Sequence, residues 1–547
     1  MRKWSVGFSL ALAVCLWAQT GAPEKVDLGV LHRIKIEAFA SRSKVMDTAF
    51  YLTDVYGPRL TASPAAKQAG DWAVKTLSDW GLSNVAMEKW AFAGAGWSCT
   101  RYVGMMEEPE FQPIIGFALP WTLGTNGPVT GDAVLAVITN ADEMAQYKGK
   151  LKGKFVLTAT PHDSEMVTAP YAHRLTDAEL AAAEISPDPI SGNPASLPLG
   201  FPTRTPAAGF ARGGAAGRGA AAAGRGAPGA AGGRGGLRAQ LAKFYKDEGA
   251  LALLTPGNGP DGGTVVGSGS QTTEENAPIA SVVMTNEHYN RIARLLEKNI
   301  PVKLEFDIQT KFTPPGDSFN IVAEIPGTNP NAGTVMLGGH FDSWTGGTGA
   351  TDNAAGASVA MEAIRILKAL DLKMPRTVRL ALWTGEEEGE LGSRAYVRAH
   401  LEGANGPLPE QSKISAYYNL DNGAGKIRGI YMQDNDAVQP IFAAWVAPLK
   451  DLGADALTIR STGSTDHTNF DSAGVPGFEF IQDPLEYAPR THHSNMDVYD
   501  RLQVNDLEQA SAVLAWFVYN TATRPEMLPR IAPPAGRGGG GRGRGGQ

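Results

Sequence analysis

An alternation of strand and helix patterns, which begins near Asn320 and runs to about Tyr519, constrains the fold of this chain more than any other feature. Short runs of β-branched and other apolar residues, which predict strands, alternate with runs whose apolar residues recur every three or four positions, which predict helices. The expected strands are residues 333–338, 377–383, 414–420 and 477–481, and the expected helices are residues 354–370, 438–452 and 505–519. This order favours an α/β fold with a mixed, mostly parallel sheet covered by helices on both faces.

The chain before this region shows two different sequence patterns. Residues 31–82 carry helical spacing, whereas from about residue 116 short strand patterns and turns dominate, for example at 134–139 and 250–255. We therefore expect an N-terminal part at 24–115, a β-rich domain at 116–312, and a main domain at 313–525.

Residues 1–18 are typical of an export signal. Arg2 and Lys3 precede an apolar stretch, Phe8–Trp17, that is short for a membrane span and is followed by small residues suited to cleavage. We expect an exported protein, periplasmic or extracellular, with no stable membrane insertion. The alternatives are an uncleaved anchor or a lipid on Cys15.

Two stretches rich in small residues and arginine are expected to be disordered, because they lack apolar surface to offset chain entropy. They are an Ala/Gly/Arg loop at 205–236 and a Gly/Arg tail at 526–547. Disordered Arg-Gly repeats sometimes bind RNA, so an RNA-binding protein is an alternative function. The formal net charge of −7 argues against a dedicated nucleic-acid binder, and we expect no nucleic-acid partner.

Histidines and carboxylates follow the predicted strands at the places where active sites of α/β sheets lie. Each of these residues alone is more often structural, but their coincidence at four strand ends favours a metal site. They are His340 and Asp342, Asp352 at the next helix start, Glu386-Glu387-Glu388, Asp421, and the His492-His493 pair.

The residue types indicate which metal such a site would hold. With only two cysteines, Cys15 and Cys99, sulfur ligation is excluded. Histidines mixed with carboxylates suit a catalytic zinc, or manganese or cobalt. Two histidines and three acidic residues are too many for one tetrahedral zinc with an open position, and they suit two ions that share a carboxylate.

The motifs together resemble metallopeptidase family 28, which includes di-zinc aminopeptidases and carboxypeptidase Q. The resemblance is firm over about 320–519, extends to the segment 54–61, and implies that 116–312 contains an inserted protease-associated domain. The motifs that carry it are His340-Phe-Asp342, Gly349-Ala-Thr-Asp352-Asn353, Glu386-Glu387-x-Gly-x-x-Gly-Ser393, Asn419-Leu-Asp421, Asp466-His467 and His493-x-x-x-Asp497.

The resemblance also implies roles and two Zn²⁺ per chain. Asp352 would bridge the ions, His340 and Asp421 would complete one site, and Glu387 and His493 the other. Glu386 would be the general base, although a register shifted by one residue makes Glu387 the base and Glu388 the ligand. Asp342 would orient His340, and the family implies a cis bond between Asp352 and Asn353.

The implied activity is hydrolysis of short peptides by an exopeptidase. The stretch from His340 to Trp344 looks more like the carboxypeptidase Q branch, which favours dipeptides and implies a homodimer, but Asn353 departs from that branch. An aminopeptidase is therefore the close alternative. Tyr487 is a candidate for a substrate contact, and a catalytically inactive peptidase-fold binding protein is disfavoured because every ligand position is filled.

Overall fold

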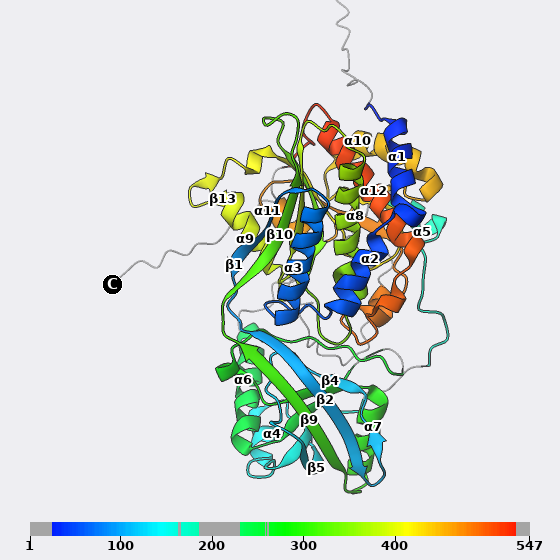
Figure 1. Cartoon of the computed structure of the whole chain (residues 1–547). Coiled ribbons are helices and arrows are strands. Elements are labelled where there is room, and N and C mark those ends of the chain that lie inside the picture. The colour runs from blue at the N-terminus through cyan, green and yellow to red at the C-terminus, as the bar shows by residue number, and fades with distance from the viewer. Residues whose placement is uncertain (1–23, 162–165, 185–229, 258, 260–261, 532–547) are drawn as a thin grey trace, which may run out of the picture.

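A computed structural model describes residues 24–161, 166–184, 230–257, 259 and 262–531 (Figure 1). The predicted export signal at 1–18, most of the Ala/Gly/Arg loop and the end of the tail lie outside these residues. Among the described helices, none combines the length and the apolar character needed to cross a membrane.

The larger part of the molecule is built on a mixed eight-stranded sheet. Its strand order is β1-β10-β12-β11-β15-β18-β16-β17, and β12, β11, β15 and β18 run parallel at its centre. These central strands are buried along their length, as expected for strands covered on both faces. The bounds are β1 Ser83–Ala91, β10 Asp317–Ile325, β11 Thr334–His340, β12 Thr377–Trp383, β15 Ile414–Asn419, β16 Ile427–Tyr431, β17 Ala456–Thr458 and β18 Gly477–Gln482.

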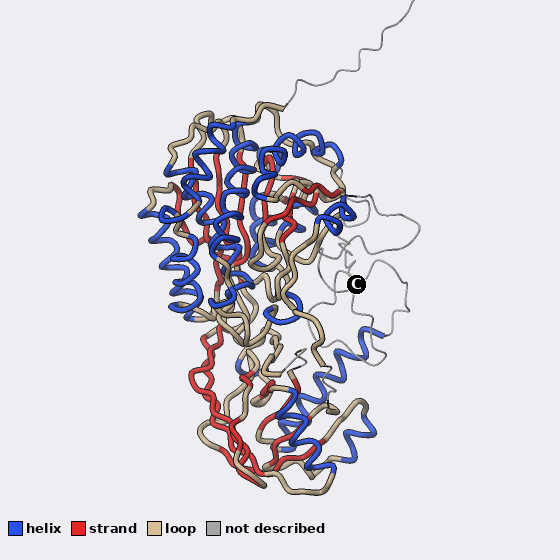
Figure 2. Tube along the Cα trace, turned by 90° about the vertical axis from the view of Figure 1, so that its right-hand side faces the viewer, coloured by secondary structure: helices blue, strands red, loops and turns tan. Residues whose placement is uncertain are grey.

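Helices cover this sheet on both faces, and Figure 2 shows its strands running between helices. One face shares a large apolar core with α1 (Leu28–Ala38), α2 (Val45–Phe50), α3 (Pro64–Asp79), α8 (Ala355–Ala369), α10 (Gln439–Val446) and α12 (Val504–Thr523). The other face packs against α9 (Leu391–His400) and α11 (His467–Ser472). The predicted α/β fold with a mixed, helix-covered sheet is therefore confirmed.

The smaller part carries a second eight-stranded sheet, drawn below the first in Figure 1. Its order is β3-β2-β9-β5-β6-β7-β8-β4, with β5, β6, β7 and β8 parallel. The bounds are β2 Gly96–Glu108, β3 Gln112–Pro113, β4 Gly116–Ala118, β5 Val129–Leu135, β6 Lys154–Leu157, β7 Ala252–Pro256, β8 Ser281–Met284 and β9 Lys303–Thr313.

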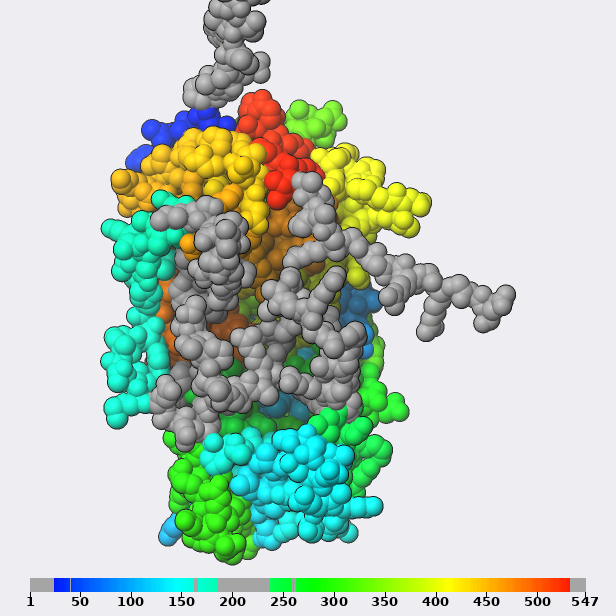
Figure 3. Space-filling model, turned by 180° about the vertical axis from the view of Figure 1, so that it is seen from behind, coloured from blue at the N-terminus to red at the C-terminus, as the bar shows by residue number. Residues whose placement is uncertain are grey.

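Helices also cover both faces of this second sheet. Residues of α7 (Asn286–Glu297) share a core with one face, and residues of α4 (Ala141–Gln146) and α6 (Ala230–Glu248) with the other. In the view from behind, the smaller part is the cyan-to-green region at the bottom of Figure 3. The short helix α5 (Asp177–Glu184) returns to the larger part, where it packs beside β17.

Several predicted boundaries are wrong. We expected the β-rich domain to begin at residue 116, but β2 already belongs to the second sheet, because it pairs with β9 from Gly96 onward. The helical stretch 31–82 is split into α1, α2 and α3, and α10 stops at Val446 before a 3-10 segment, Ala447–Leu452. The assignment of the smaller part as a protease-associated domain stays a prediction.

The described parts of both stretches that we expected to be disordered are ordered. Helix α6 begins at Ala230, so residues 230–236 are helical rather than loop; extending a helix costs less than starting one, and its later turns pack in the core of the smaller part. The tail is ordered from 526 to 531, because Leu528 is buried and Arg530 donates to the carbonyl oxygens of Gly474, Gln411 and Ile414.

Candidate metal centre

The structure brings the five predicted ligands together from separate segments of the larger part. His340 ends β11, Asp352 lies with non-helical backbone angles in the kinked segment Ala350–Ala354 before α8, and the remaining three follow strands β12, β15 and β18. The three groups of side chains whose ligand atoms converge are Asp352-His492-His493, His340-Glu386-Asp421 and His340-Asp352-Glu387.

Asp352 lies at the centre of this arrangement. Its Oδ1 is 3.2 Å from His340 Nε2, which is also 3.2 Å from Asp421 Oδ1. Its Oδ2 is 3.4 Å from His493 Nε2, which is 3.0 Å from Glu387 Oε2. The two carboxylate oxygens of Asp352 thus face two different pairs, each made of one histidine and one carboxylate.

The donor set fits two divalent cations. Asp352 Oδ2 and Glu387 Oε1 are buried and accept no hydrogen bond from protein groups, which leaves them free to bind an ion. Burial, and next the charge of Asp352, raise the pKa of Glu387 well above its ordinary value. Burial also opposes ionisation of Asp352, but its contact with His340 and the nearby histidines lower its pKa overall. Bound cations would relieve the mutual repulsion of these carboxylates.

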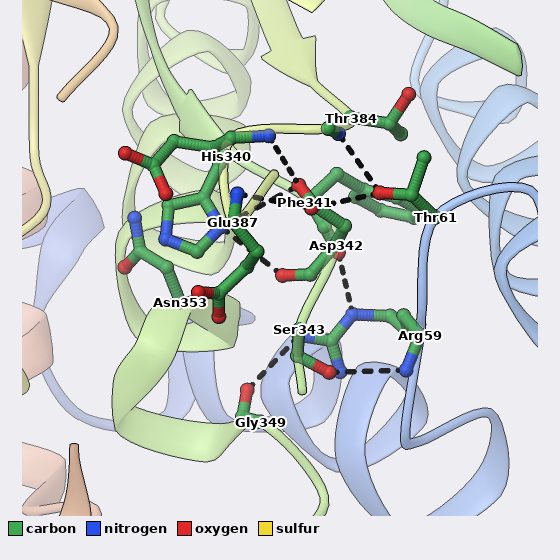
Figure 4. A network of polar contacts seen from close by, with 12 residues as sticks. Arg59, Thr61, His340, Phe341, Asp342, Ser343, Gly349, Asn353, Thr384 and Glu387 are labelled. Atoms are coloured by element: carbon green, nitrogen blue, oxygen red, sulfur yellow. Dashed lines mark hydrogen bonds and ion pairs between the residues drawn. The ribbon is translucent and has the colours of Figure 1, made fainter. Parts of the chain in front are cut away.

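Asp342 contacts His340, its predicted partner, and also the acidic turn. His340 Nδ1 lies 3.1 Å from the backbone carbonyl oxygen of Asp342 but 3.6 Å from its carboxylate. The carboxylate instead accepts hydrogen bonds from the backbone N–H groups of Glu386 and Glu387 and from the hydroxyl of Thr61 (Figure 4). Asp342 therefore fixes the acidic turn with its side chain and the His340 ring with its main chain.

The three adjacent glutamates have different surroundings. Glu387 contacts His493, and Glu386 converges with His340 and Asp421, whereas Glu388 belongs to none of the three ligand groups. Burial, together with the charges of Asp421 and Asp466, raises the pKa of Glu386 well above its ordinary value. A carboxyl with a raised pKa beside candidate ligands suits a proton acceptor that must later release its proton.

Asp497 supports the segment that carries Asp352. Its carboxylate accepts from the Thr351 N–H at 2.6 Å, the Thr351 hydroxyl at 2.8 Å and the Asp352 N–H at 3.2 Å. Burial, with the charge of Asp352, raises the pKa of Asp497 to about 7. The peptide bond between Asp352 and Asn353 is cis, as the family resemblance implied.

Sequence reasoning missed Arg59 as a structural element of the site. Its side chain is fully buried, and its guanidinium donates to four backbone carbonyls, those of Phe341 (2.7 Å), Leu52 (2.6 Å), Thr348 (3.0 Å) and Gly349 (2.9 Å) (Figure 4). Burial lowers the pKa of Arg59 to about 10, against the opposing effect of the nearby carboxylates. The only sequence signal was its place in the segment 54–61, to which the family resemblance extends.

Sequence reasoning also missed Glu479, which supports Asp421. Its carboxylate accepts from the Asp421 N–H at 3.0 Å and from the Asn419 amide at 2.7 Å. Burial and the charge of Asp421 raise its pKa to about 8. Because Glu479 lies inside β18 among apolar residues, its isolated acidic side chain was the available signal.

Two aromatic side chains, those of His492 and Tyr487, lie close to His493. His492 stacks on His493 with ring centres 3.7 Å apart, and its Nε2 is 3.9 Å from Asp352 Oδ2. Tyr487, a predicted candidate for a substrate contact, is buried and packs edge-on against His492 at 5.0 Å. Its substrate role stays a prediction.

Comparisons with known proteins agree with this geometry. Residues 320–518 match Peptidase family M28. Human carboxypeptidase Q is 26% identical over 88% of this chain and 85% of its own length, and leupeptin-inactivating enzyme 1 of Streptomyces exfoliatus is 31% identical over 41% of this chain and 52% of its own length.

Solved structures share the fold over nearly the whole chain. A peptidase M28 precursor from Shewanella amazonensis has a TM-score of 0.63 at 22% identity and covers 92% of this chain and 98% of its own. A zinc aminopeptidase from Bacillus subtilis has a TM-score of 0.51 at 19% identity, with 88% and 95% covered.

Proposed function

Because this chain belongs to peptidase family M28 through residues 320–518, we propose that it is an exported exopeptidase that hydrolyses short peptides at a centre of two zinc ions. The observation that carries the proposal is the position of Asp352, whose two oxygens face His340 with Asp421 on one side and His493 with Glu387 on the other. One carboxylate shared between two such pairs suits a centre of two neighbouring ions.

The proposed mechanism is hydrolysis of a peptide bond by water. When bound, two Zn²⁺ would make that water more acidic and polarise the substrate carbonyl. Glu386 takes the proton of the attacking water and passes it to the leaving amine, a role that its converging position beside His340 and Asp421 allows. Asp342 holds the Glu386 backbone in place for this transfer.

The charges around the centre support substrates with a free α-amino group. Arg59 lies among these carboxylates, but it is fully buried and four of its five N–H groups donate to backbone carbonyls, so it is poorly placed to bind a substrate carboxylate. Seven carboxyl groups surround the centre, those of Asp342, Asp352, Glu386, Glu387, Glu388, Asp421 and Asp497, and Arg59 is the basic group among them. We therefore propose cleavage of dipeptides and short peptides next to a free amino terminus.

Two further parts of the proposal rest on sequence alone. Export rests on the charged start and apolar run of residues 1–18, which lie outside the described residues. A homodimer rests on the resemblance to the carboxypeptidase Q branch.

The test compares hydrolysis of free dipeptides, N-blocked peptides and aminoacyl anilides by the purified protein before and after chelation. We expect cleavage only where the α-amine is free, and loss of cleavage on chelation that added Zn²⁺ reverses. Cleavage of N-blocked peptides at the same rate would contradict the proposed substrate class, and undiminished activity after chelation would contradict the metal mechanism.

The Glu386→Gln variant tests the assignment of the base. It keeps the shape of the side chain but cannot accept a proton, so we expect kcat to fall about 10²- to 10⁴-fold while two zinc ions per chain remain bound. Glu388→Gln is the control for the register of the acidic triplet and should also retain both ions. If Glu386→Gln kept full turnover, or if Glu388→Gln lost an ion, the residue assignment would be wrong.

A further inference from the structure

His493 lies in a segment that needs support from outside itself. We call residues 485–497, which follow β18, the histidine loop. His493 has φ of +58°, in the left-handed region that residues with a Cβ atom rarely occupy. Its side chain must nevertheless lie within reach of both Glu387 and Asp352.

Residues 263–267 of the smaller part, here called the clasp segment, bind the histidine loop next to His493. The Asn495 N–H donates to the Val265 carbonyl at 3.1 Å, and the Val265 N–H donates to Asn495 Oδ1 at 2.7 Å. Asn495 Nδ2 donates to the Gly263 carbonyl at 2.9 Å. Asn495 thus uses its main chain and both ends of its amide on a single partner segment.

The clasp segment also binds His493 directly. The Gly267 N–H donates to the His493 carbonyl at 3.0 Å, and Val266 forms an isolated β-bridge with Ser494. These bonds fix the backbone at the carbonyl of His493 and at the two residues that follow it. Contacts from a distant part of the chain thus add to the loop's own hydrogen bonds, such as the one from the Ser494 N–H to the Thr491 carbonyl at 3.0 Å.

The clasp segment is anchored in the core of the smaller part. Val265 and Thr264 are buried, and the Val266 N–H donates to the Gly257 carbonyl at 2.9 Å. The Gly257 N–H in turn donates to the carbonyl of Met284, the last residue of β8. The histidine loop is therefore connected by backbone hydrogen bonds to the second sheet.

Trp344 provides a second contact of the same kind. It lies four residues after His340, yet its side chain is buried in the core of the smaller part, where it packs edge-on against Trp121 at 6.2 Å. Its ring is 6.0 Å from the ring of His493. The segment that follows His340 and the segment that carries His493 thus both contact the smaller part.

We propose that Asn495 is a positioning residue through which the smaller part of the molecule holds His493 in place beside Glu387 and Asp352. This inference rests on the proposed two-ion centre. It assigns the smaller part a role in metal binding: without the Asn495 amide, the histidine loop loses its two side-chain bonds to the clasp segment, and one of the two ligand pairs loosens.

The experiment titrates Zn²⁺ into the metal-free full-length protein by calorimetry and measures bound zinc in the dialysed product. In Asn495→Ala we expect the affinity of one of two zinc ions to fall about 10- to 100-fold, the range seen when groups that orient ligands are removed, with the other ion unchanged. Asn495→Asp keeps an acceptor for the Val265 N–H but loses the donor to Gly263. Its affinity for that zinc ion should therefore lie between those of the wild type and Asn495→Ala. His493→Ala supplies the reference for a protein with one ion.

Asn435→Ala is the matched control, because Asn435 Nδ2 donates to the Pro529 carbonyl at 2.8 Å and belongs to none of the ligand groups. It should lower thermal stability without changing zinc affinity. Unchanged zinc affinity in both Asn495 variants, or an equal loss in Asn435→Ala, would overturn the inference. A wild-type protein that binds fewer than two zinc ions would instead contradict the proposed function.

Discussion

Arg59 shows how a single residue outside the ligand set shapes this site. Its guanidinium joins the carbonyl of Phe341, next to His340, with those of Thr348 and Gly349, which precede Asp352. A charged group is costly to bury, and here its N–H groups are matched by carbonyl oxygens that need donors. The position of Arg59 therefore couples the geometry of two metal-ligand segments.

Replacing Arg59 by methionine keeps much of the side-chain volume but leaves four carbonyls without this donor. The Gly349 carbonyl still accepts from the Ala354 N–H. Because each of the other three, left unpaired, costs about 1–3 kcal/mol, we expect the free energy of unfolding to fall by at least about 3 kcal/mol, and zinc affinity to fall with it. Urea unfolding and zinc titration measure these changes.

The control for this variant is Arg33→Met. Arg33 is exposed and donates one hydrogen bond to the Leu370 carbonyl, so its loss should change stability by no more than about 0.5 kcal/mol. A loss below about 1 kcal/mol for Arg59→Met would show that Arg59 does not hold these segments.

At the scale of elements, helix α9 links the acidic turn to the edge of the sheet. It begins at Leu391, just after the three glutamates, and ends at His400. His400 Nε2 lies 2.5 Å from Glu88 of β1, and its Nδ1 lies 3.5 Å from Glu410. Contacts with Glu410 and then Glu88 raise the pKa of His400 to about 9, and the same pairing lowers the pKa of Glu410 to about 2.

The sign of these shifts predicts a pH-dependent contribution to stability. A histidine whose pKa is raised by folding stabilises the protein fully below its unfolded pKa of about 6.5, and this contribution is lost as the pH rises through 9. The contribution of Glu410 is present above about pH 4.5 and is lost as the pH falls toward 2. Both contributions are present together between about pH 4.5 and 6.5.

We therefore expect His400→Gln to lower the free energy of unfolding by about 1 kcal/mol near pH 6, after allowance for partial solvent exposure, and by almost nothing at pH 10. Urea unfolding at a series of pH values measures the difference from wild type. His32→Gln, at an exposed position of α1, is the control. A difference that grows between pH 6 and pH 10 would contradict the assignment.

At the scale of the whole molecule, the candidate centre depends on both parts of the chain. Four of the proposed ligands lie in segments that follow or adjoin the central strands of the first sheet, while the backbone of the fifth, His493, is bound by the clasp segment of the smaller part. Ions at this centre would bind the folded protein and not the unfolded chain, so they would stabilise the arrangement as a whole.

Removal of the metal should accordingly lower thermal stability. With free zinc at about 100 times its dissociation constant, one site adds about 2.7 kcal/mol, so we expect a chelator to lower the Tm by about 5 °C and added Zn²⁺ to restore it. Differential scanning calorimetry measures the shift. Asp352→Ala, which lacks the shared ligand, should show no such shift, and identical melting of the wild-type protein with and without chelator would contradict metal binding at this centre.

The sequence by itself determined the fold class and the identity of the residues that converge. The fold class follows from apolar periodicity, which marks the central strands, and parallel strands deliver the residues at their carboxyl ends, His340 and Asp421 among them, to one edge of the sheet. The choice of Glu387 among the three glutamates and of His493 in its pair came from the family resemblance. Only the tertiary structure decided that β2 belongs to the second sheet, that Arg59 and Glu479 support the ligands, and that Asn495 binds the clasp segment. These contacts join residues far apart in the chain, and nothing in the local pattern of either partner specifies which distant backbone group it will meet.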